Sequence, residues 1–386
     1  MPLPRRSFFK HSLTAATGLS LANAAIAAVA DEAAKPDGLI VRSRRPLDLE
    51  TPIDRLGDEF TPTEWFFVRS HHGEPPVRTA GWSIACDGLF AAPQTFDLRG
   101  LFASFPRVER PAVCMCAGNG RGLFEPRIPG LPWERGAVGQ ALWSGIRLRD
   151  VLERLGPTAM AKHIVFEGAD LPPTPQTPAF IRSLPIERAL EADVLLADRM
   201  NGVPLPVVHG GPVRVVVPTW TANHWMKWVR RITASDEEAP GMYQRTGYKM
   251  PDVPLPPDVP PTPAQMKPVT ALNVKSLITW PLAGARLARG RHVVRGLAWT
   301  GTGTIQDVAV RIRADAAFVA ATITTADRIP GAWVRFEAPI DLPAAGDYAI
   351  ASRATDTGGN AQPAAAVWNK SGYLYNAIDP VPVRVT

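Results

Sequence analysis

The sequence predicts an α+β domain with mixed sheets, followed by an all-β sandwich domain. With 386 residues, the chain is longer than one ordinary core requires, so two domains are expected. A proline-rich stretch at 250–268 divides it. Short strand patterns alternate with a few helical ones before this stretch, and only strand patterns recur after it.

The part before the boundary mixes both kinds of pattern. Helical spacing of apolar residues predicts a helix over 148–155, ended by Gly156 and Pro157. A second helix is expected over 185–192, and residues 31–63 are expected to form an irregular arm. Strands are expected where apolar and β-branched residues cluster between turn residues, at 65–69, 81–86, 112–116, 164–166, 213–217 and 228–234.

The boundary itself contains eight prolines, which predict an extended and rather stiff linker. This gives a first domain at 31–250, a linker at 251–268 and a second domain at 269–386. In the second domain, polar or glycine-rich turns separate strand patterns, which is typical of a sandwich. The strand patterns are at 292–298, 307–313, 332–338 and 348–355.

The N-terminus resembles an export signal of the twin-arginine type. Arg5 and Arg6 are followed by two phenylalanines, a lysine and an alanine- and leucine-rich stretch to residue 30. Small residues at its end predict cleavage before Asp31. A membrane anchor is the alternative, but the apolar stretch is short and its burial in lipid would be weak. We therefore expect residues 1–30 to be removed and the protein to be periplasmic.

Charge and hydropathy argue against two kinds of partner. The net charge of +6 falls to +3 without the three basic residues of the signal. No basic run remains that suits a nucleic acid. No later segment is apolar for long enough to span a bilayer, so no membrane span is expected in the mature protein.

The strongest chemical signal surrounds two closely spaced cysteines. Three cysteines in the chain, with two in one tripeptide, do not suit a disulfide framework. A thiolate suits a transition metal, small residues allow close backbone approach, and an arginine suits an oxyanion. From these residues alone, a buried structural cysteine beside a glycine turn is an equally good interpretation. The segment is Cys114-Met115-Cys116-Ala117-Gly118-Asn119-Gly120-Arg121.

This segment resembles the molybdenum-binding segment of the sulfite oxidase family. Further resemblances follow in order, and that order makes them specific. They run from about residue 65 to the C-terminus, where the second domain resembles the family's immunoglobulin-like dimerisation domain. The segments include Phe66-Phe67-Val68-Arg69-Ser70-His71, Phe166-Glu167-Gly168-Ala169-Asp170, Met200-Asn201-Gly202, His209-Gly210-Gly211-Pro212-Val213-Arg214, Met226-Lys227-Trp228, Gln244-Arg245-Thr246-Gly247-Tyr248-Lys249 and Trp368-Asn369.

The resemblance implies a molybdopterin cofactor whose molybdenum is bound by the Cys116 thiolate. Cys114 has no counterpart in the family and is expected in the core. The implied substrate pocket consists of Arg69, Arg121 and Tyr248. The implied cofactor contacts are Phe67, Val68, Arg69, Ser70, His71, Asp170, His209, Arg214, Trp225, Met226 and Lys227.

The chemistry of these side chains agrees with the implied roles. Arg214 and Lys227 suit the phosphate of molybdopterin, and a pair of arginines can neutralise a small dianion. The Tyr248 hydroxyl can hydrogen-bond the substrate. Taken singly, each residue has an ordinary structural interpretation, and only the ordered set favours the functional one. The chain departs from residues common in the family at Ser70, Gly120, Thr219, His224 and Trp225.

Together these inferences predict an enzyme that oxidises sulfite, or a similar small sulfur oxyanion, to sulfate. Since no haem-binding segment is found, electrons are expected to pass to a separate c-type cytochrome. The second domain implies a homodimer, with an appended sandwich on a monomer as the alternative. Two other functions stay open: oxo transfer on a sulfane sulfur or sulfoxide, and a cofactor-free exported binding protein.

Overall fold

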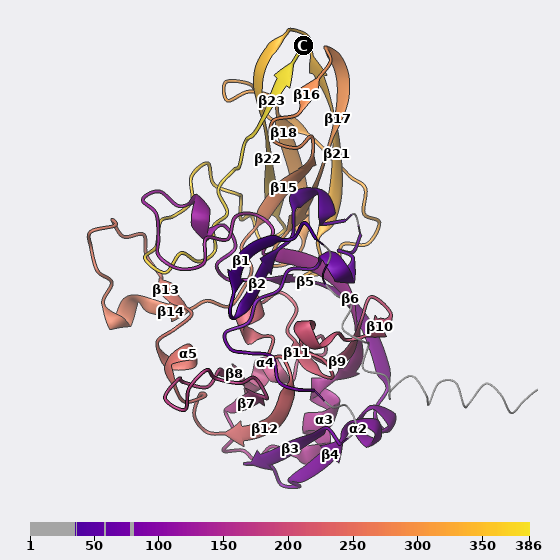
Figure 1. Cartoon of the computed structure of the whole chain (residues 1–386), viewed down its shortest axis with the longest axis vertical. Helices are drawn as coiled ribbons and strands as arrows, with labels where there is room; N and C mark the ends of the chain where they lie inside the picture. The colour runs from indigo at the N-terminus through magenta and orange to yellow at the C-terminus, as the bar shows by residue number, and fades with distance from the viewer. Residues whose placement is uncertain (1–34, 36, 58, 78–80) are drawn as a thin grey trace, which may run out of the picture.

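The computed structural model describes residues 35, 37–57, 59–77 and 81–386. The expected export signal at 1–30 lies outside the described residues. The described chain forms two parts along the long axis, an α+β part and a sandwich of strands that contains the C-terminus (Figure 1). This confirms the predicted fold class. No described helix is long and apolar enough to cross a membrane.

One sheet of the α+β part carries the strand that leads to the cysteines. Its strand order is β10-β9-β6-β5, and β11 also pairs with β9. All pairings are antiparallel. Because β5 ends at Met115, Cys116 begins the turn beyond the sheet. The strands are β5 (Arg107–Met115), β6 (Val138–Arg147), β9 (Leu195–Met200), β10 (Val203–Pro204) and β11 (Arg214–Val216).

The second sheet makes the α+β part a mixed one. Its strand order is β4-β3-β12-β7-β8. β12 pairs parallel with β3 and antiparallel with β7, although β3 and β12 are far apart in sequence. The strands are β3 (Ser83–Gly88), β4 (Gln94–Asp97), β7 (His163–Gly168), β8 (Ile181–Pro185) and β12 (Val229–Ser235).

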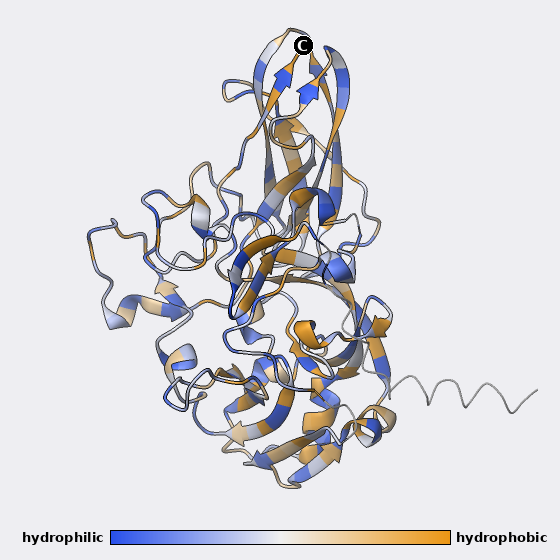
Figure 2. Ribbon diagram, in the orientation of Figure 1, coloured by the Kyte–Doolittle hydropathy of each residue, from blue (hydrophilic) through white to orange (hydrophobic). Residues whose placement is uncertain are grey.

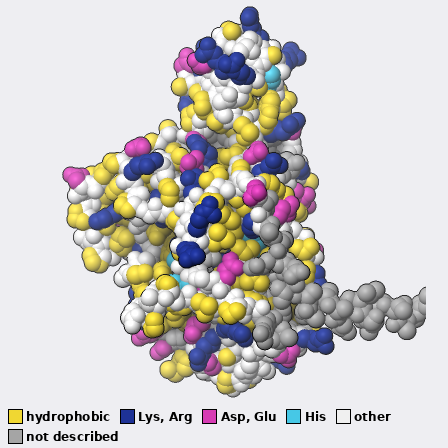
Figure 3. Space-filling model, in the orientation of Figure 1, with side chains coloured by type: hydrophobic (Ala, Val, Ile, Leu, Met, Phe, Trp, Pro, Cys, Tyr) yellow, Lys and Arg dark blue, Asp and Glu magenta, His cyan; other side chains and the backbone are white. Residues whose placement is uncertain are grey.

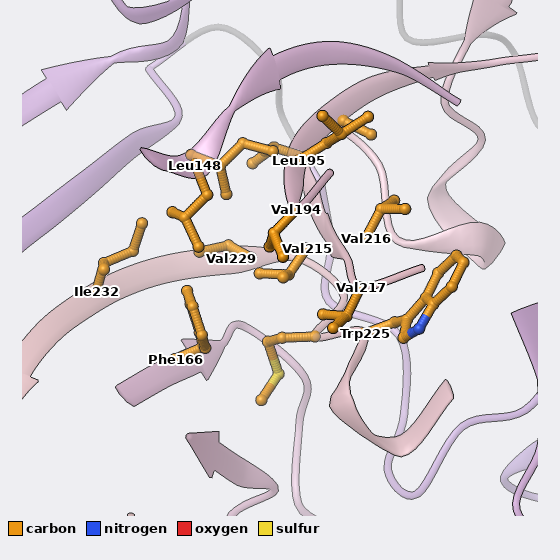
Figure 4. Packing of buried hydrophobic residues seen from close by; sticks show 14 of the residues in the cluster. Leu148, Phe166, Val194, Leu195, Val215, Val216, Val217, Trp225, Val229 and Ile232 are labelled. Carbon is orange, nitrogen blue, oxygen red and sulfur yellow. The ribbon is translucent and has the colours of Figure 1, made fainter. Parts of the chain in front are cut away.

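Both sheets contribute to one apolar core. Figure 4 shows Leu148, Phe166, Val215 and Ile232 converging in it from a helix and three strands. The four valines of the run at 213–217 are fully buried, which explains why consecutive residues there are apolar rather than alternating; Arg214 is the one polar residue among them and is buried as well.

Within the described residues, helices are few and short. Leu148, Val151, Leu152 and Leu155 are buried along one face of α3, and Gly156 ends the helix with a φ of 65°. The predicted helix over 148–155 is therefore confirmed, whereas the one over 185–192 shrinks to a single turn. The helices are α2 (Leu98–Ser104), α3 (Leu148–Leu155), α4 (Ile186–Ala189) and α5 (Met242–Arg245).

The predicted irregular arm at 31–63 is wrong for its middle. A hairpin forms there from β1 (Ile40–Arg44) and β2 (Leu47–Glu50). Burial here does not follow the alternation of apolar and polar residues that predicts a strand, because an acidic residue occupies a buried position. The Glu50 carboxylate is buried and pairs with Arg42 at 2.6 Å.

The predicted strand at 65–69 is also wrong. A 3-10 turn covers Thr63–Trp65, and the extended residues after it make one isolated bridge, between Val68 and Leu49. The apolar residues face the core and the chamber described below, so their pattern reflects burial rather than sheet pairing.

The proline-rich segment does not run extended between the two parts. Its ends pair with each other, β13 (Lys249–Pro251) against β14 (Met266–Pro268), so that the chain between them forms a projecting loop (Figure 1). The prolines stiffen a loop rather than a linker. The predicted domain boundaries at 250 and 269 remain predictions.

The C-terminal part is the predicted all-β sandwich. Two sheets have the strand orders β15-β17-β21-β20 and β16-β23-β22-β18-β19. Alternating burial along β21 appears in Figure 2 as alternating bands. The strands are β15 (Lys275–Trp280), β16 (Arg286–Leu287), β17 (Gly290–Trp299), β18 (Ile305–Arg311), β19 (Val319–Ala320), β20 (Thr322–Ile323), β21 (Val334–Leu342), β22 (Gly346–Asp356) and β23 (Val381–Val385).

The two parts share a buried apolar cluster. Val113 and Met115 of β5 pack there with Leu277, Leu297 and Trp299 of the sandwich. On the face shown in Figure 3, Lys and Arg side chains gather at the tip of the sandwich and mix with acidic ones elsewhere. Other arginine side chains, among them Arg182 and Arg214, are buried inside the molecule.

Candidate active site

Two adjoining chambers, an inner and an outer one, meet beside the turn after β5. A group bound at Cys116 would face both chambers, since this thiol lines both of them. The side chains common to the two linings are Arg69, His71, Cys116 and Tyr248.

The structure brings all but one of the predicted site residues to these chambers. Arg121 lines only the outer one. Val68 lines neither, because its side chain packs with Leu39 and Leu49 outside the site. The predicted residues that line only the inner chamber are Phe67, Ser70, Asp170, His209, Arg214, Trp225, Met226 and Lys227.

A tight turn presents the Cys116 side chain. The Cys116 carbonyl accepts a hydrogen bond from the Asn119 N–H at 2.9 Å. Gly120 follows with a φ of 88°, and a Cβ there would lie 2.5 Å from the Tyr375 side chain. Glycine is therefore required for both conformation and space.

The two neighbouring cysteines differ in their surroundings. Burial raises the pKa of the Cys116 thiol, and the guanidinium groups of Arg69 and Arg121 oppose this rise. Burial raises the pKa of Cys114 to about 11. Cys114 lines only the inner chamber and belongs to the apolar core, as the sequence predicted. Within the described residues, no three His, Cys, Asp or Glu side chains form a metal-binding group.

Arg214 brings a buried positive charge to the inner chamber. Its guanidinium donates to the carbonyls of His209 (2.7 Å) and Trp225 (3.2 Å). It also lies against the Trp143 ring, 5.0 Å from the ring centroid. Carbonyls and rings hold the group in place without neutralising it, so the charge stays available to an anion.

Lys227 is the second buried cation of the inner chamber. Its ammonium donates to the Ser70 hydroxyl (2.7 Å) and to the Val208 carbonyl (3.2 Å). Burial lowers the pKa of Lys227 to about 7. Asp170 is the acidic member of this lining, and burial raises the pKa of its carboxyl group. An anion in the chamber would favour the charged form of Lys227.

Among the described residues that line the outer chamber, two carry guanidinium groups and none is acidic. Arg69 contacts the Asp48 carboxylate at 3.3 Å. Arg121 donates to the Ser371 carbonyl at 3.3 Å and lies over the Tyr373 ring, 5.3 Å from its centroid. The chamber therefore suits a small anion.

Tyr248 and His71 form the wall between the chambers. The Tyr248 oxygen lies 2.6 Å from His71 Nε2. Burial lowers the pKa of His71 well below its usual range, so the ring is neutral and accepts from the phenol. Burial also raises the pKa of Tyr248. The phenol therefore stays protonated at neutral pH.

Sequence reasoning missed several residues around the chambers. Arg182 of β8 is buried, donates to the Tyr243 carbonyl and lies 5.4 Å from the Tyr248 ring centroid. Lys35 contacts His209, and Tyr373 comes from the C-terminal segment. An arginine within a short apolar strand was the only signal for Arg182. The other two had none, because only tertiary packing brings them to the site.

Comparison with known proteins identifies the class. Residues 71–243 match the family described as oxidoreductase molybdopterin binding domain, and residues 266–386 match the Mo-co oxidoreductase dimerisation domain. Sulfite oxidase of Gallus gallus is 36% identical over 88% of this chain and 76% of its own length. The mitochondrial sulfite oxidase of Homo sapiens is 33% identical over 92% of this chain and 68% of its own length.

One solved structure is similar to this fold over almost the whole chain. The crystal structure of the sulfane dehydrogenase SoxCD from Paracoccus pantotrophus has a TM-score of 0.75 and 28% identity, covering 96% of this chain and 92% of that one. The protein is therefore a molybdopterin-dependent oxidoreductase. More specifically, the chain belongs to the sulfite oxidase family.

The chambers fit the molybdenum cofactor of this family. The inner chamber supplies the buried cations of Arg214 and Lys227, which a phosphate needs. Among the described residues, the buried Nε of Arg214 and Nδ2 of Asn223 have no hydrogen-bond partner. A Cβ on Gly210 would lie 2.8 Å from the Lys227 side chain. Cys116 offers a soft thiolate where the chambers meet.

Proposed function

We propose that this protein oxidises sulfite to sulfate. The main supporting observation is that Arg69 and Arg121 line the outer chamber together with Cys116, with no acidic side chain among the described residues of its lining. These groups bind and orient a small sulfur oxyanion by charge-assisted hydrogen bonds. The Tyr248 hydroxyl, whose proton is donated to His71, adds a neutral oxygen that can accept a hydrogen bond at the same place.

When bound, the molybdenum cofactor supplies oxygen-atom transfer and two-electron redox chemistry. Overall, sulfite and water give sulfate, two protons and two electrons. The protein's part is to hold the cofactor in the inner chamber, to neutralise the anion in the outer chamber and to position the two against each other. The electrons pass to a c-type cytochrome as an external acceptor.

A second candidate substrate is a sulfane sulfur. The similarity to a sulfane dehydrogenase extends over almost the whole chain. The outer chamber also has more room than sulfite needs, with Trp133, Met242, Tyr243 and Tyr373 in its lining. Apolar and aromatic walls suit a sulfur atom carried on a larger group.

The test is metal analysis of the purified protein together with cytochrome c reduction. Sulfite-dependent reduction that requires molybdenum supports the proposal. Reduction with a sulfane donor but not with sulfite would favour the second candidate. Activity in a molybdenum-free preparation would contradict both.

We also propose that the twin-arginine signal exports the protein to the periplasm as a homodimer. The support is the sequence around Arg5 and Arg6 and the match to a dimerisation domain. The double variant Arg5→Lys, Arg6→Lys should leave the protein in the cytoplasm. An unchanged periplasmic yield would refute the export route. Light scattering of the purified protein should give twice the chain mass, and a single-chain mass would refute the dimer.

A further inference from the structure

Lys35 reaches the wall of the inner chamber from a position that precedes β1. Its ammonium nitrogen lies 2.8 Å from the Thr63 carbonyl and 3.0 Å from the Phe66 carbonyl. It also lies 2.7 Å from Nε2 of His209, a buried residue that lines the chamber. Three acceptors thus match the three protons of one ammonium group.

These contacts determine where the His209 ring carries its proton. Burial lowers the pKa of Lys35 to about 7, and in its charged form the group can only donate. Both carbonyls can only accept, so the third ammonium proton then points to His209 Nε2, which offers its lone pair. Nε2 also lies 3.3 Å from the Thr63 carbonyl, a contact that would need a proton on Nε2. The Lys35 contact is 0.6 Å shorter, and a protonated Nε2 would set two donors against each other. The neutral ring therefore carries its proton on Nδ1.

We propose that Lys35 is a positioning residue for the cofactor, acting by fixing His209 in the Nδ1–H tautomer. This inference rests on the role proposed for His209 in holding the cofactor. It leaves the Nδ1–H as the one ring group that His209 can offer to a bound cofactor, as a donor rather than an acceptor. Burial lowers the pKa of His209 well below its usual range, which agrees with a neutral ring.

Phe66 supports both Lys35 and His209. The edge of the Phe66 ring packs against the His209 ring, with centroids 5.5 Å apart. Phe66 also supplies a carbonyl to Lys35, so one residue supports both partners. Groups that orient a ligand residue from behind typically change cofactor or metal affinity 10–100-fold when they are lost.

The test uses the full-length cofactor-loaded protein with the variant Lys35→Met. The rate of cofactor release is followed by the fluorescence of the freed pterin, so no substrate is needed. We expect release to be about tenfold faster. The exposed Lys162→Met is the matched control and should release at the wild-type rate. Because turnover is not measured, this result is independent of whether sulfite is the substrate.

Two further measurements separate positioning from general destabilisation. Release from Lys35→Met is measured well below the melting temperature of its cofactor-free form, so that unfolding does not contribute. The double variant Lys35→Met, His209→Gln should release no faster than His209→Gln alone, since Lys35 acts through His209. Lys35→Arg, which keeps the charge and donors, should restore slow release in part. Unchanged release in Lys35→Met, or additive effects in the double variant, would overturn the inference.

Discussion

The inner and outer chambers share four side chains but are built in different ways. The inner chamber draws its lining from residues 66–248 of the α+β part, and its cations are held by carbonyls and rings. The outer chamber adds Tyr373 from the C-terminal segment and exposed Met242 from α5. On the function proposed above, a preformed cofactor site is thus separated from a substrate site that two parts of the chain assemble. Substrate preference can change at the outer chamber while the cofactor site stays intact.

The largest effect on turnover is expected at Cys116, which lines both chambers. Cys116→Ser should reduce turnover below detection, because a hydroxyl is a much poorer molybdenum ligand than a thiolate. Cys114→Ser should keep turnover, since Cys116 and not Cys114 lies where the two chambers meet. Molybdenum content and turnover of both variants check this prediction. An inactive Cys114→Ser enzyme with a full metal content would reverse the assignment.

Lys227→Met should separate cofactor binding from folding. Loss of a buried cation from the inner chamber should leave most of the purified protein without cofactor, as pterin content per chain will show. The exposed Lys370→Met is the control.

The same variant has the opposite effect on the empty protein. Burial lowers the pKa of Lys227 to about 7, below its unfolded value. The charged lysine therefore destabilises the fold fully below pH 7, and this penalty fades as the pH rises toward 10. Cofactor-free Lys227→Met should melt higher than the wild type at pH 6, with the gap closing toward pH 10. A lower melting temperature at pH 6 would contradict the sign.

Arg121→Gln should act on substrate binding alone. A charge-assisted hydrogen bond is worth about 1.5–3 kcal/mol, so KM for sulfite should rise about tenfold or more. Molybdenum content should not change, because Arg121 lines only the outer chamber. Steady-state kinetics, with the exposed Arg127→Gln as control, checks this. A fall in molybdenum content would contradict the assignment of Arg121 to substrate binding alone.

The smallest effect is expected for Tyr248→Phe. It removes one hydroxyl from the shared wall, so kcat should fall several-fold, a loss of about 1 kcal/mol. Since burial raises the pKa of Tyr248, the phenol does not ionise in the working range. The alkaline limb of the kcat/KM profile should therefore be the same in both enzymes. A limb that disappears in Tyr248→Phe would show that the phenol titrates.

The sequence predicted the inner chamber better than the outer one, for a physical reason. The segments around Arg69, Cys116 and Lys227 each carry several site residues, so local motifs locate them. Tyr373 and Arg182 act singly and reach the site only through the packing of distant elements. Strand patterns likewise predicted β7, β11 and β12 but not the hairpin of β1 and β2. Its buried acids are satisfied by Arg42 of the same hairpin and, from outside it, by Arg69 and the Gly136 N–H.

The C-terminal segment also limits how such enzymes can be recombined. The Leu374 N–H donates to the Ala117 carbonyl at 2.9 Å, directly after Cys116, and Tyr375 packs against Gly120. Arg135 forms an ion pair with Asp379 across the same boundary. A chimera that exchanges the sandwich at residue 269 would therefore also replace part of the active-site wall. Grafts that keep a functional pocket must transfer residues 369–379 together with the loop at 117–135.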